Sequence, residues 1–181
     1  MSKSTLSLAL GLVLSLAANA LAQEGPSPLL TRSEPELLAV LQSEASHKTK
    51  ADACRELAVI GTAASIPVLV RLLPDQKLSH MARYALETLD DDSVDAALRQ
   101  ALTDTEGRPR LGVISSLGAR QDAKAVGPLA DLLGHNDSMV IQAAARALGR
   151  IGNARAAQAL LRALPETSSS SQLALEEGLF R

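Results

Sequence analysis

The sequence predicts an all-α fold built from repeated pairs of antiparallel helices. Its 46% hydrophobic content includes only two aromatic residues, Tyr84 and Phe180, so the core must consist of leucine, alanine, valine and isoleucine. Alanine and leucine are the strongest helix formers. Apolar residues also recur at helical spacing, and the whole pattern returns about every 31 residues.

A column of leucines marks the first helix of each pair. Leu57, Leu86, Leu117, Leu148 and Leu179 are separated by 29, 31, 31 and 31 residues, and an apolar residue stands four positions before each. Three positions after the first four leucines come Ile60, Leu89, Arg120 and Ile151. This i, i+4, i+7 spacing is the buried stripe of one helix. Because Arg120 interrupts the apolar column, the third of these helices is expected to end a residue or two earlier.

The second helix of each pair carries two leucines four residues apart. These are Leu69 and Leu73, Leu98 and Leu102, Leu129 and Leu133, and Leu160 and Leu164. The turns between paired helices read "GTAAS", "DDDS", "RQDAK" and "GNARA", which supply residues that end one helix and cap the next. We interpret "DDDS" at 90–93 as a turn and N-cap, because it lacks the ligand spacing of a calcium loop.

One such helix pair is too small to bury its own apolar face, so neighbouring pairs must stack to complete the core. We expect the solenoid to span residues 35–181. It comprises a cap helix at 35–44, repeats near 50–74, 79–103, 109–133 and 138–164, and a partial repeat at 171–181.

The N-terminal segment differs from the rest of the chain. "MSKSTLSLALGLVLSLAANALAQ" has one cation, Lys3, then an apolar run and small residues at Ala20 and Ala22. This is the layout of a secretory signal peptide, which predicts cleavage after Ala22, with Ala20 as the alternative, and a linker at 23–34. An uncleaved membrane anchor is disfavoured because the run is shorter than the roughly 20 residues a spanning helix needs. We therefore expect a secreted or periplasmic protein that meets a membrane only transiently.

The segments "AAARALGRIG" and "AAQALLRAL", together with the short period, resemble the HEAT-like repeats that also occur in phycobilin lyase subunits. The resemblance covers residues 35–181 and is strongest at 140–164. It implies a right-handed α-solenoid in which the second helices line the concave face. It carries little information about function, because such repeats serve unrelated tasks.

Residues with potential chemistry are few and scattered. His47 and His135 are expected in loops and His80 at a helix start, without metal-ligand spacing, and Cys54 is expected to be a buried core residue. Deoxyhypusine hydroxylase, an enzyme with HEAT-like repeats, binds iron through His-Glu dipeptides, and this sequence has none. We therefore predict no catalytic residue, cofactor or metal.

The remaining candidate is a surface. Two positions after the first core leucine of each second helix stand Arg71, Gln100, Asp131 and Arg162, with Arg99 and Arg155 nearby. Such a row could bind another protein or an extended peptide on the concave face, although a merely solvated face is the simpler interpretation. With 18 basic and 20 acidic side chains, the chain lacks the positive charge of a nucleic-acid-binding protein.

Two classes of function follow. The first is an exported scaffold or adaptor that binds protein without catalysis. The alternative is enzymatic, either as the N-terminal accessory module of a larger secreted enzyme or as a lyase-like HEAT-repeat protein.

Overall fold

The structure, a computed structural model, describes residues 32–166 and 169–180. The expected signal peptide (1–22) and most of the expected linker lie outside these residues, as does Arg181. The chain from Arg32 onward forms one compact unit. Its described helices are α1 (Glu34–Gln42), α2 (His47–Ile60), α3 (Ile66–Val70), α4 (Ser79–Thr88), α5 (Asp92–Asp104), α6 (Gly107–Ala119), α7 (Val126–Asp131), α8 (Ser138–Ile151), α9 (Ala154–Ala163) and α10 (Ser169–Leu179).

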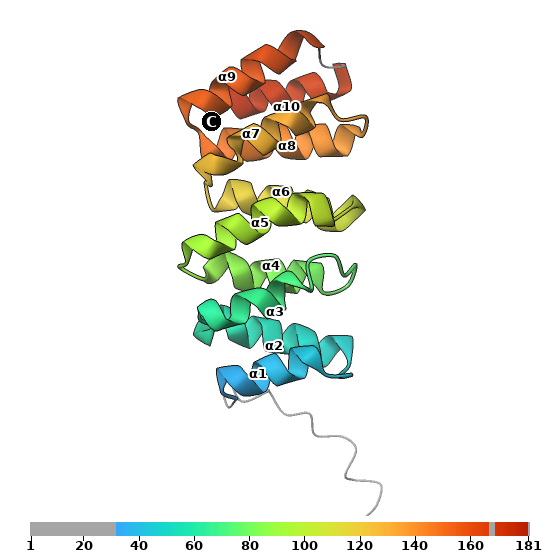
Figure 1. The fold of residues 1–181 in the computed structure, drawn as a ribbon. Helices are drawn as coiled ribbons and strands as arrows, with labels where there is room; N and C mark the ends of the chain where they lie inside the picture. Colours follow the sequence, from blue (N-terminus) through green and yellow to red (C-terminus); the bar gives the residue numbers. More distant parts are fainter. Residues whose placement is uncertain (1–31, 167–168, 181) are drawn as a thin grey trace, which may run out of the picture. The chain divides into compact units, whose positions relative to one another are not determined.

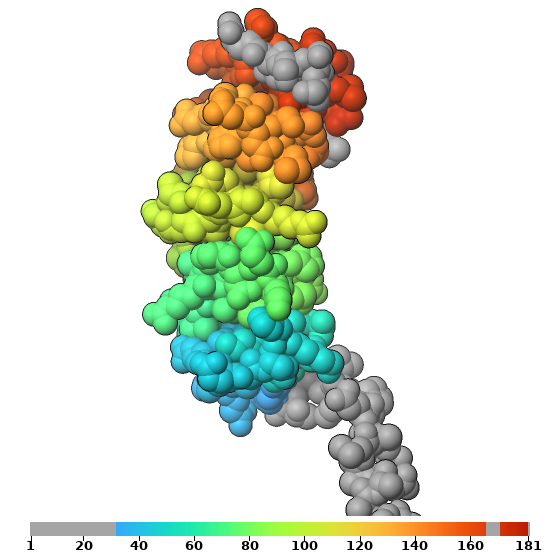
Figure 2. Space-filling view, turned by 90° about the vertical axis from the view of Figure 1, so that its right-hand side faces the viewer, coloured from blue at the N-terminus to red at the C-terminus, as the bar shows by residue number. Residues whose placement is uncertain are grey.

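These helices form two layers. The even-numbered helices, which are the first helices of the pairs, pack in the order α2, α4, α6, α8 and α10, and the odd-numbered helices lie in front of them (Figure 1). In the space-filling view, the repeats form successive bands, and each band meets only the bands next to it (Figure 2). No described residue lies in a strand. The prediction of an all-α solenoid is therefore confirmed.

The leucine columns form the core, as the sequence predicts. Leu57, Leu86, Leu117 and Leu148 are each 0% exposed, and so are Leu69, Leu98 and Leu129 of the second helices. Fully burying a leucine side chain contributes roughly 1.5–3 kcal/mol relative to leaving it exposed. One continuous cluster of buried apolar residues runs from Leu37 in α1 to Leu175 in α10.

Small residues let successive first helices approach closely. A Cβ added to Gly118 of α6 would lie 2.7 Å from the Cα of Ala147 in α8. One added to Gly149 of α8 would lie 2.6 Å from the Cα of Gly178 in α10. In each of these contacts, the residue directly after the column leucine of one helix meets the residue directly before the column leucine of the next helix. The alanines and glycines of the sequence therefore set the spacing of the layer.

Side-chain caps end and start the helices at the predicted turns. Asp91 accepts a hydrogen bond from the backbone N–H of Ser93 at 2.8 Å and caps α5, as expected for "DDDS". Asn153 caps α9 by accepting from the N–H of Ala156 at 2.9 Å. Gly152 ends α8 at a φ of 65°, a left-handed conformation that favours glycine.

The structure corrects the expected position of one histidine. His47 is the first residue of α2 and does not lie in the preceding loop, because Ser46 caps the helix one residue before it. Two second helices are also short: α3 has 5 residues and α7 has 6, so Leu73 and Leu133 are buried beyond their ends. The expected early end of the third first helix is confirmed, because α6 stops at Ala119.

The contact between α4 and α6 is polar, unlike the glycine and alanine contacts of α6, α8 and α10. The Arg83 guanidinium lies over Gly112, where an added Cβ would come within 2.4 Å of Arg83 Nε. Arg83 Nη1 donates to Ser116 Oγ at 3.2 Å, and Ser116 in turn donates to Glu87. Longer side chains thus stand where small residues lie in the later repeats, and α4 and α6 pack less closely.

Two further arginines form polar contacts between the second and third repeats, and we call this set of arginine contacts the arginine joint. Arg120 donates through Nη1 to the carbonyl oxygen of Leu89 at 2.9 Å and pairs through Nε with Asp95. Arg99 of α5 pairs with Asp122 in the turn that follows α6. Beside the shared apolar core, arginine side chains that bind carboxylates and backbone carbonyls therefore join the second and third repeats.

The buried column predicts a large cost for truncating one of its leucines. Leu117→Ala should lower the free energy of unfolding by about 2–5 kcal/mol, because it removes buried apolar atoms and leaves a cavity. Gln100→Ala, at an exposed position of α5, should change it by less than about 0.5 kcal/mol. Chemical denaturation measures both values, and equal losses would show that the repeat alignment is wrong.

The close helix contact predicts opposite effects for two glycine substitutions. Gly149→Ala should destabilise the fold by about 1–3 kcal/mol, because its methyl group would collide with the backbone of Gly178. Gly127→Ala in α7 meets nothing within 4 Å and should stabilise the fold by about 0.4–1 kcal/mol, since alanine restricts the unfolded chain. Thermal unfolding of both variants tests the pair; a similar shift in both would refute the proposed contact.

Candidate functional site

The histidines do not converge on a site. His47 opens α2 and His80 is the second residue of α4, and both are exposed. His135 follows the second helix of its repeat, and its Nδ1 accepts from the backbone N–H of Asp137 at 3.0 Å. Within residues 32–166 and 169–180, no group of three or more histidine, cysteine, aspartate or glutamate side chains is placed to hold a metal ion.

Cys54 is buried in α2, as expected, and is 0% exposed. Burial raises the pKa of its thiol to about 11, because the apolar surroundings disfavour the thiolate. The thiolate is the nucleophilic form of cysteine. The thiol is therefore protonated at neutral pH, and Cys54 acts as a small apolar core residue.

The predicted polar row is exposed on α5, α7 and α9 and at Arg71, the residue that directly follows α3. Arg71, Gln100, Asp131 and Arg162 are all exposed, and they occupy the same position in each repeat. Arg71, Asp131 and Arg162 make no side-chain hydrogen bond or ion pair with any other described residue. Arg155 near the start of α9 is exposed and equally unpaired. These side chains are available to a partner.

Arg99, the sixth candidate, is held inside the fold. Its side chain is 22% exposed and pairs with Asp122, whose side chain is 5% exposed. The Asp122 carboxylate also accepts from the backbone N–H of Lys124 at 2.9 Å, so the same carboxylate caps the turn after α6 and pairs with Arg99 of α5. The structure thus places Arg99 in the joint between the second and third repeats and apart from the exposed row.

The row borders a shallow hollow between α7 and α9. This hollow has a volume of about 350 Å³. Asp131 and Arg162 lie at its edge, and its floor consists mainly of small side chains, including Ala130, Ala159 and Ala163. Asp131 and Arg162 carry opposite charges and do not pair with one another. Both can therefore receive polar groups of a bound chain.

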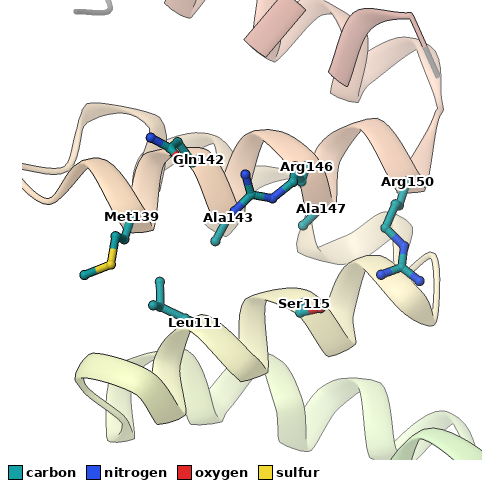
Figure 3. A pocket seen from close by; sticks show the side chains of 8 residues that line it. All are labelled: Leu111, Ser115, Met139, Gln142, Ala143, Arg146, Ala147 and Arg150. Carbon is teal, nitrogen blue, oxygen red and sulfur yellow. The ribbon is translucent and has the colours of Figure 1, made fainter. Parts of the chain in front are cut away.

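A second hollow, of about 480 Å³, lies between α6 and α8 in the other layer. Leu111 and Ser115 of α6 face Met139, Arg146 and Arg150 of α8 across it (Figure 3). Met139 and Leu111 point toward one another at one end, and the Arg150 guanidinium lies at the other (Figure 3). We define these five residues as the α6–α8 groove.

The α6–α8 groove is not among the surfaces predicted from the sequence, although the aligned repeats contain a signal for it. Ser115 stands at the position that holds Arg55 in α2, Tyr84 in α4 and Arg146 in α8. A serine among these long side chains leaves space on the outer surface of α6. The sequence does not distinguish the two arginines of α8 from the others. The stacking of the repeats determines which arginines pair with a carboxylate.

The described part of the chain defines an all-α solenoid with polar side chains exposed on both layers. Residues 96–179, from α5 to the end of α10, match the family model for HEAT repeats. Residues 96–179 are therefore HEAT-like repeats, and the match supports a HEAT-like repeat protein. No curated protein matches it. HEAT repeats generally mediate protein–protein interactions and are typically non-catalytic scaffolds.

None of the described helices is long and apolar enough to cross a membrane.

Proposed function

We propose that this protein is an exported HEAT-repeat scaffold or adaptor that binds another protein and catalyses no reaction of its own. The observation that carries the proposal is the exposed row on the second helices. Four repeats present a polar side chain at one equivalent position, and three of the four make no side-chain hydrogen bond or ion pair with another described residue.

The charges of the row suit an extended partner. Arg71 and Arg162 are cationic, Asp131 is anionic and Gln100 can both donate and accept hydrogen bonds. Repeat arrays bind extended chains because equivalent positions recur at regular intervals along one surface. The hollow between α7 and α9 adds a place for one partner side chain beside Asp131 and Arg162.

Site-specific crosslinking tests the proposal. A photoreactive amino acid replaces Gln100 or Arg162 in the full chain, which is then irradiated in secreted and envelope fractions of the native cells. Both positions should yield a crosslinked species containing the same second protein. Both residues are exposed, so the replacements should leave the thermal unfolding midpoint unchanged.

The matched control is Val59, which is 69% exposed on α2 in the other layer. The probe at Val59 should not yield the species formed from Gln100 and Arg162. An equal yield from Val59, or no species from the row, would argue against a protein-binding surface on the second helices.

Export is the second part of the proposal. The charged start, the apolar run and the small residues at Ala20 and Ala22 support secretion or transfer to a periplasm. N-terminal sequencing of protein isolated from native cells should begin at Gln23. A sequence that begins at Met1 would contradict cleavage and the exported location that depends on it.

A further inference from the structure

We infer that the α6–α8 groove binds an acidic helical segment of a protein partner, with one apolar side chain of the partner between Met139 and Leu111. This surface lies on the first-helix layer and is separate from the row on the second helices. The inference rests on the proposed function in one respect, namely that the protein binds another protein.

The first argument is the state of the two arginines. Arg146 and Arg150 are exposed, and no carboxylate among the described residues pairs with either. By contrast, Arg83, Arg99 and Arg120 are each engaged with a carboxylate or a backbone carbonyl. The groove therefore presents two guanidinium groups whose donors are free for a ligand.

The second argument is the spacing of these groups. Arg146 and Arg150 lie four residues apart on α8, and residues at that spacing are neighbours on one helix face. A guanidinium forms two parallel hydrogen bonds with a carboxylate. The two side chains extend in different directions (Figure 3), but their positions on α8 are one helical turn apart. Two acidic side chains one helical turn apart match this spacing when the partner helix runs along α8.

The third argument is the apolar end. Met139 is 58% exposed, and Leu111 faces it from α6 (Figure 3). Seven residues separate Met139 from Arg146, which corresponds to about two helical turns, or roughly 10 Å. The matching partner helix thus carries an aliphatic residue about two turns from the nearer of its two acidic residues.

The groove is also held in place at its ends and floor. The close contact of Gly118 with Ala147 fixes α6 against α8 beneath it. Gln121, in the turn after α6, donates through Nε2 to the carbonyl oxygen of Arg150 at 3.2 Å. The two walls therefore have little freedom to move apart, and the ligand meets a surface that is already formed.

The test uses a fluorescent helical peptide with one leucine and two glutamates at this spacing, and a twin in which both glutamates are glutamine. Fluorescence anisotropy measures the binding of each to the full chain. The acidic peptide should bind at least about tenfold more tightly than its twin, and its affinity should fall as salt is added.

Two variants test the residues. Arg146→Gln combined with Arg150→Gln should weaken binding of the acidic peptide by about tenfold or more. Ser115→Phe, which fills the groove without changing the charge, should weaken it comparably. All three positions are exposed, so circular dichroism and the unfolding midpoint should match those of the unaltered protein.

The control is Lys48→Gln combined with Arg55→Gln on α2. It removes the same charge from the same layer, where Arg55 occupies the repeat position of Arg146 and both cations flank Asp52. Peptide binding should stay within about twofold. Equal weakening by both double variants, equal binding of the glutamine twin, or arginine-dependent binding to anionic phospholipid vesicles in preference to the peptide would overturn the inference.

The two proposals fail separately. Loss of peptide binding in the groove leaves the crosslinks from Gln100 and Arg162 unaffected. If those crosslinks are absent, the affinity of the acidic peptide for Arg146 and Arg150 is unaffected.

Discussion

The close approach of successive first helices is the constraint on which the later repeats depend. Gly118 lies against Ala147 and Gly149 against Gly178, at distances that leave no room for a further methyl group. This contact fixes the spacing of the layer. The fixed spacing brings the column leucines together in one core, from which water is excluded. It also gives the α6–α8 groove its floor, so the same small residues serve both stability and the candidate surface.

Arginines divide into two groups according to what the stacking offers them. Arg99 and Arg120 reach a carboxylate and a carbonyl oxygen of the neighbouring repeat, and Arg83 reaches the Ser116 hydroxyl between α4 and α6. Arg146 runs along α8 and Arg150 extends toward the end of α6, and Ser115 on the facing side of the groove offers no acidic partner (Figure 3). Residues of one type therefore act as structural joints in one place and as open donors in another.

The sequence predicts the periodic and local features well, because they depend on residue type and spacing. The leucine columns and the caps at Asp91 and Asn153 lie where they were expected. The pairing of Arg99 with Asp122 joins residues 23 positions apart and depends on how two repeats stack, so the sequence groups Arg99 with the exposed row. The α6–α8 groove depends on the absence of a long side chain at Ser115, which only comparison of aligned repeats would reveal.

The arginine joint also determines how such an array could lengthen by duplication. A unit copied from the region between α6 and α10 carries a small residue on each side of its first helix. Its contacts with both neighbours would therefore resemble the existing contacts of Gly118 with Ala147 and of Gly149 with Gly178. A unit copied from the second repeat carries Arg83 and Glu87, which need Ser116 in the unit that follows. If two copies of the second repeat followed one another, Arg83 and Glu87 of the first copy would face Ala85 of the second copy, because Ala85 occupies the repeat position of Ser116. The units are therefore similar in length but not interchangeable in order.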